Sequence, residues 1–152
     1  MMVSRILVVF FVIVQASVGI GQSFREAEVK DIALFPVQND FRNTLNLSGI
    51  WKFKKDADGV GEKEGWYNGL ANSQSIAVPG SWNEQLEDIR TYMGVVWYEQ
   101  SSYIPKSWKG QKIYLRVGSA NYAAKIWLNG KPLGKHDGGH LPFALELGSD
   151  IN

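Results

Sequence analysis

The chain has 152 residues, 45% of them hydrophobic and 12% aromatic, and its 16 lysine and arginine residues nearly balance 15 aspartate and glutamate residues. This apolar fraction can bury a core, and the net charge of +1 provides no basic surface for a nucleic acid. The sequence holds no cysteine, which excludes disulfides, thiolate zinc ligands and a cysteine nucleophile. Its length suits one domain, not a domain plus a barrel of about 250 residues. Sixteen glycines, six tryptophans and six tyrosines favour an all-β domain.

The N-terminus, residues 1–21, is predicted to be a secretory signal peptide. Arg5 precedes an apolar run at 6–14, and four small residues follow it: Ala16, Ser17, Gly19 and Gly21. The alternative is a membrane anchor, but nine residues rise only about 14 Å as a helix, against a hydrocarbon core of about 30 Å. We therefore expect a secreted, periplasmic or lysosomal protein, with no membrane attachment after cleavage. Residues 22–44, interrupted by Pro36, are predicted to form an arm leading into the domain.

The first strand of the domain is predicted at 49–54, where Trp51 and Phe53 alternate with lysines, a pattern typical of a half-buried antiparallel strand. The glycine-rich stretch 59–69 is predicted to be a surface loop, anchored by two aromatic residues, Trp66 and Tyr67. Further strands are predicted at 76–78, 95–104, 112–117, 123–128, 131–134 and 141–147. Short strands separated by turns indicate an antiparallel sandwich, either jelly-roll or immunoglobulin-like.

Two turns carry clear local signals. Asn129-Gly130 predicts a type I′ hairpin, because both central residues of that turn need a positive φ. Ser81, with Glu84 three residues later, predicts a capped helical turn through Leu86. Acidic residues near a helix start have an electrostatic explanation, so a catalytic pair among Glu84, Glu87 and Asp88 is the less favoured interpretation.

The sequence His136-Asp137-Gly138-Gly139-His140 contains both histidines. Histidines spaced i, i+4 share a face on a helix and can bind a metal there, but the two glycines favour a turn, so we expect no metal site. The sequence contains no nucleotide-binding or nucleophile-elbow motif, and no cofactor is expected. Three tryptophans could stack on sugar rings or belong to the core: Trp66, Trp82 and Trp108.

Several ordered motifs resemble a known family. They are IAVPGSWNEQ at 76–85, DIRTYMGVVWYEQ at 88–100, GQKIYLRVGSANYAAKIWLNGKPLGKHDGGHLPF at 110–143 and, upstream, LSGIWKFKKDADGVGEKEGWY. Together they resemble the N-terminal sugar-binding jelly-roll domain of glycoside hydrolase family 2, and within it the β-glucuronidase branch. Relatives acting on galactosides or mannosides share the W-Y and N-G-x-x-x-G-x-H-x-G-G patterns, so these patterns do not identify the sugar.

The resemblance implies that a jelly-roll at 45–152 precedes an immunoglobulin-like domain and a (β/α)₈ barrel, which acts on a glycoside or glycan as a retaining enzyme with two glutamates about 5 Å apart. No catalytic residue is then expected in this chain, which is read as a fragment that stops before the last strands of its first domain. A homo-oligomer of the full-length enzyme is a further possibility that the resemblance raises. The alternatives are a stand-alone carbohydrate-binding module and a β-galactosidase or β-mannosidase of the same family.

The resemblance also points to individual residues. The loop 88–94 is expected to approach the sugar pocket, so Arg90 and Tyr92 are candidates for contact with substrate. Other matching residues are expected to be structural: Trp82, Trp97, Asn129, Gly130, His136, Gly138 and Gly139. If the host is a eukaryote, Asn46 is an acceptor for an N-glycan. The core, which we expect to be partly exposed in a truncated domain, is predicted to contain Trp97, Ile113, Leu115, Ile126, Leu128 and Phe143.

Overall fold

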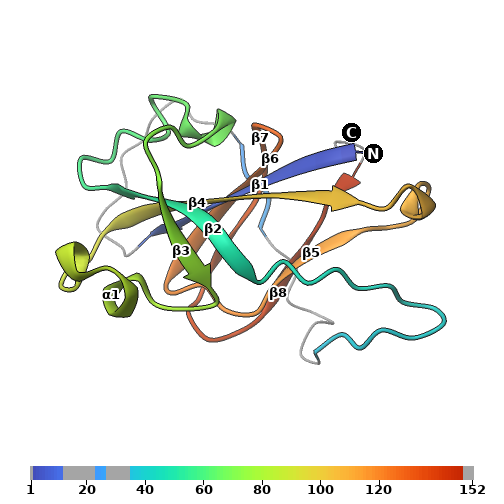
Figure 1. The fold of residues 1–152 in the computed structure, drawn as a ribbon. Helices are drawn as coiled ribbons and strands as arrows, with labels where there is room; N and C mark the ends of the chain where they lie inside the picture. Colours follow the sequence, from blue (N-terminus) through green and yellow to red (C-terminus); the bar gives the residue numbers. More distant parts are fainter. Residues whose placement is uncertain (1, 12–22, 27–34, 149–152) are drawn as a thin grey trace.

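A computed structural model describes residues 2–11, 23–26 and 35–148 of the chain (Figure 1). Six strands form one sheet in the order β3-β2-β4-β1-β6-β7, and two others form a second sheet, β5-β8. All neighbouring strands are antiparallel. The strands are β1 (Met2–Phe11), β2 (Gly49–Asp56), β3 (Gln74–Val78), β4 (Val95–Ile104), β5 (Tyr114–Val117), β6 (Ala123–Leu128), β7 (Lys131–Asp137) and β8 (Phe143–Glu146). The predicted antiparallel all-β sandwich is confirmed.

Local patterns placed most of the strands correctly. Strands β4 and β6 have the predicted bounds, and both β5 and β8 begin two residues later than predicted. In β2 the side chains of Trp51 and Phe53 are buried while Lys52 is exposed, as the alternation predicted. The hairpin between β6 and β7 turns at Asn129 and Gly130, whose φ angles are 51° and 81°. These positive values are those that a type I′ turn requires.

The N-terminal segment differs from the expectation that residues 1–21 lie outside the domain. Met2–Phe11 forms β1 in the middle of the larger sheet, hydrogen-bonded to β4 on one side and to β6 on the other (Figure 1). A run of branched apolar residues suits a central strand as well as a signal peptide, and periodicity does not separate the two. Residues 12–21 lie outside the described part of the chain. Cleavage of the segment is not tested by the structure and stays a prediction.

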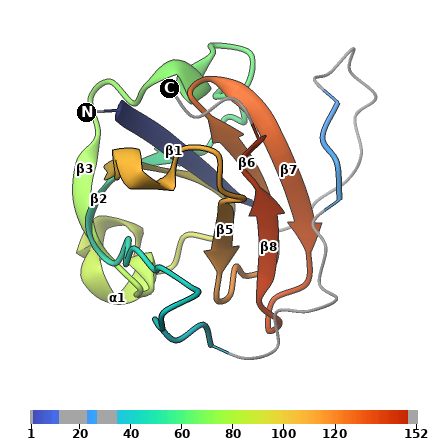
Figure 2. The same cartoon turned by 90° about the vertical axis from the view of Figure 1, so that its right-hand side faces the viewer.

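The main core lies between the two sheets. Leu115 from β5 and Phe143 and Leu145 from β8 pack with residues of the larger sheet, which establishes the two layers (Figure 2). Among the predicted core residues, Leu115, Ile126, Leu128 and Phe143 are buried in this cluster, and Ile113 is partly buried at its edge. The larger sheet contributes further buried side chains: Ile6, Val8, Trp51, Phe53, Ile76, Val96, Tyr98, Ile104 and Ala124.

A second cluster covers the outer face of the larger sheet. Trp97 and Trp127 are fully buried there with their rings stacked 5.2 Å apart. Trp66 and Tyr67 of the surface loop pack against these two tryptophans, at centroid distances of 5.9 Å each, which confirms both as anchors of the loop. Trp97 is therefore a core residue, as predicted, but of the outer cluster.

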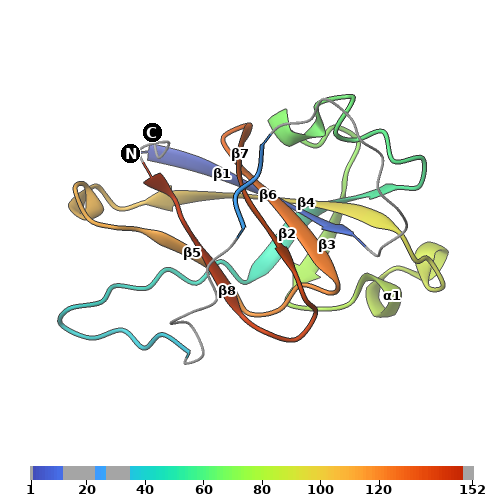
Figure 3. The ribbon, with the colours of Figure 1, turned by 180° about the vertical axis from the view of Figure 1, so that it is seen from behind.

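Residues 23–26 of the arm lie against β7 and the outer cluster (Figure 3), whereas residues 37–44 are exposed and extend away from the sheets. Phe24 contacts Trp127 edge-on at 4.9 Å, and the backbone N–H of Lys135 in β7 donates to the carbonyl of Arg25 at 2.9 Å. Residues 27–34 lie outside the described part. Within the described residues, helices are limited to α1 (Trp82–Gln85) and three 3₁₀ turns, and none has the length and apolar character needed to cross a membrane.

Candidate functional site

The segment that follows β3, residues 79–94, contains the loop expected to meet substrate. Ser81 caps α1, because its Oγ accepts the N–H of Asn83 at 3.2 Å, so the predicted helical turn is confirmed. A 3₁₀ turn at Glu87–Ile89 continues the segment, and Ile89 is buried in the main core. Gln85 ties the segment to β3, accepting the N–H of Ala77 at 2.8 Å and donating to its carbonyl at 3.0 Å. The segment that leads to the loop tip is thus held both to β3, through Gln85, and to the main core, through Ile89.

One side-chain amide fixes the tip of this loop. Nδ2 of Asn83 lies 3.1 Å from the carbonyl oxygen of Ile89, 2.9 Å from that of Arg90 and 3.1 Å from that of Tyr92. The indole Nε1 of Trp82 donates to the Tyr92 carbonyl at 3.3 Å. An amide nitrogen has two hydrogens, so the three carbonyls share two donors. Asn83 therefore holds the backbone around Arg90 in one arrangement, a role that its place in a short helix did not reveal from the sequence.

The two candidates for substrate contact have different surroundings. The Arg90 side chain is exposed and makes no hydrogen bond or ion pair with another described residue, so its guanidinium is available to a ligand. Tyr92 is half-buried, and its hydroxyl donates to the Val95 carbonyl at 3.0 Å. Burial, and secondarily the negative charge of Asp56, raises the pKa of the Tyr92 hydroxyl. Tyr92 thus belongs to the framework of the loop, while Arg90 projects from it.

The acidic residues of the same segment do not resemble a catalytic pair. Glu84, Glu87 and Asp88 are all exposed, in the first turns of α1 and of the 3₁₀ turn, where carboxylates are favoured by the helix dipole. A catalytic acid needs an environment that changes its pKa and a partner at a defined separation. Exposed carboxylates on short turns lack the burial that such an environment requires.

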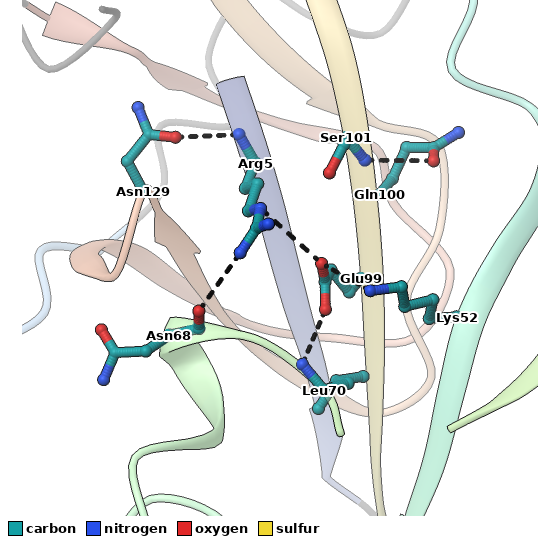
Figure 4. Close-up of polar contacts among 8 residues, drawn as sticks. All are labelled: Arg5, Lys52, Asn68, Leu70, Glu99, Gln100, Ser101 and Asn129. Carbon is teal, nitrogen blue, oxygen red and sulfur yellow. Dashed lines mark hydrogen bonds and ion pairs between the residues drawn. The ribbon is translucent and has the colours of Figure 1, made fainter. Parts of the chain in front are cut away.

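A buried carboxylate was missed in the sequence analysis. Glu99 of β4 is 2% exposed, and its side chain accepts the backbone N–H of Leu70 at 2.7 Å and contacts Lys52 Nζ at 3.2 Å (Figure 4). Arg5 Nε lies 3.9 Å from the same carboxylate. A single acid directly after the apolar run at 95–98 is the sequence signal that could have revealed it. With two cations and an N–H as partners, Glu99 stabilises the attachment of the loop to the sheet.

Beside Glu99 the surface forms an open hollow of about 500 Å³. Its lining is polar in part, and it joins the β6–β7 turn to the end of the 59–69 loop. The lining residues are Arg5, Tyr67, Asn68, Gly69, Glu99, Asn129 and Gly130. Its polar groups bond to one another: Asn129 Oδ1 accepts the N–H of Arg5 at 2.8 Å, and Arg5 reaches the Asn68 carbonyl at 3.4 Å. The hollow thus joins structural elements rather than collecting reactive groups.

Asp56 is the second buried carboxylate that the sequence analysis did not identify. It ends β2 and is 4% exposed. Its two oxygens accept the N–H groups of Val60 at 2.8 Å and Gly61 at 2.9 Å, and the indole Nε1–H of Trp97 at 3.0 Å. A Cβ on Gly61 would lie 2.4 Å from Trp97 Nε1, so only glycine allows the loop backbone to approach the ring this closely. Asp56 therefore joins the loop to the outer aromatic cluster.

The histidine-glycine motif has a structural role in the fold. His136 is buried in β7 and stacks on Phe143 of β8 with ring centroids 4.2 Å apart, whereas His140 is exposed. Gly138 has a φ of +135°, and a Cβ on Gly139 would meet Asn121 Oδ1 at 2.8 Å. Within the ranges that the structure covers, no group of three or more His, Asp or Glu side chains could hold a metal ion.

Asn46 lies just before β2 in an exposed stretch of chain. Its Oδ1 accepts the N–H of Ser48 at 2.9 Å, while the side chain as a whole is exposed. The tripeptide Asn46-Leu47-Ser48 is therefore on the surface, where a glycan can be attached. Whether a glycan is attached is not tested, so this stays a prediction.

Comparisons with known proteins agree with the resemblance read from the motifs. The model of a family described as "Glycosyl hydrolases family 2, sugar binding domain" matches residues 44–151. The β-glucuronidase of Paenibacillus borealis is 40% identical over 117 residues, covering 75% of this chain and 20% of that protein. The dog β-glucuronidase is 35% identical over 126 residues, covering 75% of this chain and 19% of that protein.

Solved structures show the same relationship. Ruminococcus gnavus β-glucuronidase superposes with a TM-score of 0.76 at 37% identity, over 79% of this chain and 20% of that one. The β-glucuronidase of an uncultured Clostridium superposes with a TM-score of 0.74 at 40% identity, over 78% of this chain and 22% of that one. The chain spans about a fifth of the length of these relatives. With its family match, its sequence relatives and its sandwich fold in agreement, the chain belongs to glycoside hydrolase family 2, in which it represents the sugar-binding domain.

Proposed function

We propose that this chain is the N-terminal sugar-binding domain of an exported retaining β-glucuronidase. The observation that carries the proposal is the similarity to β-glucuronidases, 32–40% identity over 75% of the chain. One solved relative, from Ruminococcus gnavus, is described in complex with D-glucuronic acid. The wider enzyme would hydrolyse O-glycosyl bonds of glucuronides, with an immunoglobulin-like domain and a (β/α)₈ barrel following this sandwich and with oligomerisation at the level of the full-length protein.

In this proposal the reacting groups belong to the barrel. Two glutamates about 5 Å apart act there, one as nucleophile and the other as acid and then base. The sandwich contributes support and the position of its loops. The surroundings of the carboxylates support this division, because Glu99 and Asp56 are fully engaged in structural bonds and Glu84 and Glu87 are exposed on short turns.

We propose that Arg90 is the point at which the domain meets the active site. The Asn83 amide fixes the backbone around it, and the guanidinium itself is exposed without a partner among the described residues. A guanidinium binds a carboxylate through two parallel N–H···O bonds, which matches the C6 carboxylate of a glucuronide or an acidic side chain of the barrel. An arginine on a preformed loop loses less conformational freedom on binding than one on a mobile loop.

A carbohydrate-binding module that acts alone is the competing function. Such a module usually presents an exposed aromatic platform to the sugar ring. Trp82 and Trp108 are partly buried against the main core, and Trp66 against the outer cluster, which supports a structural role for all three. Affinity electrophoresis of the chain on immobilised glucuronide-containing glycans would reveal such a platform, and we expect no retardation.

The proposed substrate is tested by expressing the longer reading frame and measuring the hydrolysis of matched aryl β-glycosides. We expect kcat/KM for the glucuronide to exceed that for the galactoside and the mannoside by at least about a hundredfold, because a site built for a carboxylate loses that pairing with a neutral sugar. Preference for the galactoside or the mannoside would assign the protein to another activity of the family.

Arg90→Ala in the same protein tests the loop, with Arg42→Ala, another exposed arginine, as control. If Arg90 binds the substrate carboxylate, KM for the glucuronide rises by about tenfold or more while any residual hydrolysis of neutral glycosides is unchanged. If Arg90 pairs with an acid of the barrel, all substrates are affected. Unchanged kinetics with every substrate would remove Arg90 from the site.

A further inference from the structure

In the larger sheet, β1 lies between β4 and β6, and the space that it occupies is called the groove below. Strands β4 and β6 are both hydrogen-bonded to β1 and not to each other, so among the described strands β1 alone connects the two halves of the sheet. Pairing with β4 extends from Met2↔Ile104 to Phe10↔Val96, and pairing with β6 covers residues 6–11 of β1. Without β1, the facing edges of β4 and β6 would present unpaired N–H and C=O groups on both sides of a gap one strand wide.

The groove also selects side chains. On the inner face, Ile6 and Val8 of β1 are buried in the main core at 4% and 3% exposure. Ser4 points to the same face and is 1% exposed, yet its hydroxyl has no hydrogen-bond partner among the described residues. A buried hydroxyl without a partner is unfavourable, so the groove is better suited to an apolar residue at this position. β1 is therefore an incompletely matched occupant.

The outer face of the groove selects a cation. Arg5 lies there, with Nε 3.9 Å from the buried Glu99 carboxylate and Nη1 3.4 Å from the Asn68 carbonyl (Figure 4). The end of the groove is set by Asn129, whose Oδ1 accepts the N–H of Arg5 at 2.8 Å and whose own N–H donates to the Arg5 carbonyl at 2.9 Å. These contacts fix the register of any strand that enters.

We propose that the space between β4 and β6 is a strand-acceptor site, and that β1 is an exchangeable occupant of it. The site takes an extended apolar segment, antiparallel to both neighbours, with apolar residues at the positions of Ser4, Ile6 and Val8 and a cation at the position of Arg5. Backbone hydrogen bonds on two sides provide affinity, and the inner side-chain positions provide specificity. Cleavage after Gly21, which the proposed export implies, would separate Met2–Phe11 from the domain and open the site.

The experiment uses the full chain with a protease site inserted between Gly21 and Gln22, so its result depends neither on signal peptidase nor on hydrolase activity. The sequence has no cysteine. We place one at Ser102, the register partner of Ser4, and add a synthetic peptide of residues 2–11 that carries Ser4→Cys. The control chain carries Ser101→Cys, which pairs with Arg5 instead and lies on the other face.

After cutting, we expect the peptide to enter and form a disulfide with Ser102→Cys and not with Ser101→Cys. An unlabelled peptide with Ser4→Val should compete about tenfold better than the natural sequence, since it removes the unpartnered hydroxyl. A peptide with Ile6→Lys should not compete, because it would bury a charge in the core.

Two results would overturn the proposal. The first is equal competition by the natural, Ser4→Val and Ile6→Lys peptides, which would show that binding does not use the groove. The second is failure of the uncut chain with Ser4→Cys and Ser102→Cys to form its internal disulfide, which would show that residues 2–11 do not occupy the groove. This second measurement decides the question if the cut chain aggregates before the peptide can enter.

Discussion

Asp56→Asn offers a sharp test of how the surface loop is attached to the sheet. The two carboxylate oxygens of Asp56 accept three N–H groups, from Val60, Gly61 and Trp97, at 2.8–3.0 Å. An asparagine keeps one acceptor oxygen and turns an NH₂ group toward a donor, so at least one N–H loses its partner in a buried place. With charged hydrogen bonds contributing about 1.5–3 kcal/mol each, we expect a loss of about 2–4 kcal/mol in the free energy of unfolding.

The measurement is thermal and urea unfolding of the chain, followed by tryptophan fluorescence. For a domain of this size about 3 °C corresponds to 1 kcal/mol, so Tm should fall by roughly 6–12 °C. Asp58→Asn is the matched control, because Asp58 is exposed two residues away and accepts no hydrogen bond from another described residue. We expect it to change stability by less than about 0.5 kcal/mol.

A double-mutant cycle separates the Trp97 bond from the other two. Trp97→Phe keeps an aromatic ring but removes the Nε1–H that Asp56 accepts. Asp56→Asn should then cost less in the Trp97→Phe background than in the natural chain, since one of the bonds it disrupts is already gone. Equal effects of Asp56→Asn and Asp58→Asn, or strictly additive effects with Trp97→Phe, would refute the assignment.

Three further predictions concern other parts of the chain. Asn83→Ala removes the donors to three loop carbonyls and should lower the free energy of unfolding, measured in urea, by about 1–3 kcal/mol. Gln85→Ala is the control: it perturbs the attachment of the segment to β3 and should leave hydrogen exchange at the loop tip unchanged. Burial raises the pKa of the Tyr98 hydroxyl, so the stability that Tyr98 contributes is present below pH 10 and is lost as the pH rises above that value. Tyr98→Phe should therefore flatten the decline in unfolding free energy between pH 9 and 11. Expressed through a eukaryotic secretory pathway, the chain should gain the mass of a glycan that Asn46→Gln abolishes, and an unmodified natural chain would remove this site.

The sequence was informative wherever the local signal and the tertiary structure agree. The Asn129-Gly130 turn, the cap at Ser81 and the alternation around Trp51 each depend on neighbouring residues, and each is found in the structure as predicted. The strand bounds at 95–104 were also predicted correctly, because that stretch begins with β-branched and aromatic residues and ends before Pro105, which are likewise local signals.

The sequence was less informative wherever a role depends on distant partners. Glu99 and Asp56 are buried because Leu70, Trp97 and the loop backbone provide their hydrogen-bond donors, and those donors lie up to 41 residues away. The apolar run at the N-terminus has the composition of both a signal peptide and a central strand. Only the presence of two open strand edges decides which structure it takes in the folded chain.

The central claim is that this domain supports a glycosidase without carrying out the hydrolysis. The most direct measurement is turnover of an aryl β-glucuronide by the purified 152-residue chain, with the longer protein as positive control. We predict no turnover by the chain and full activity in the longer protein. Hydrolysis by the chain alone that survives repeated purification, and that is lost on substitution of Glu84, Glu87 or Glu99, would contradict the claim and place the reacting carboxylates in this domain.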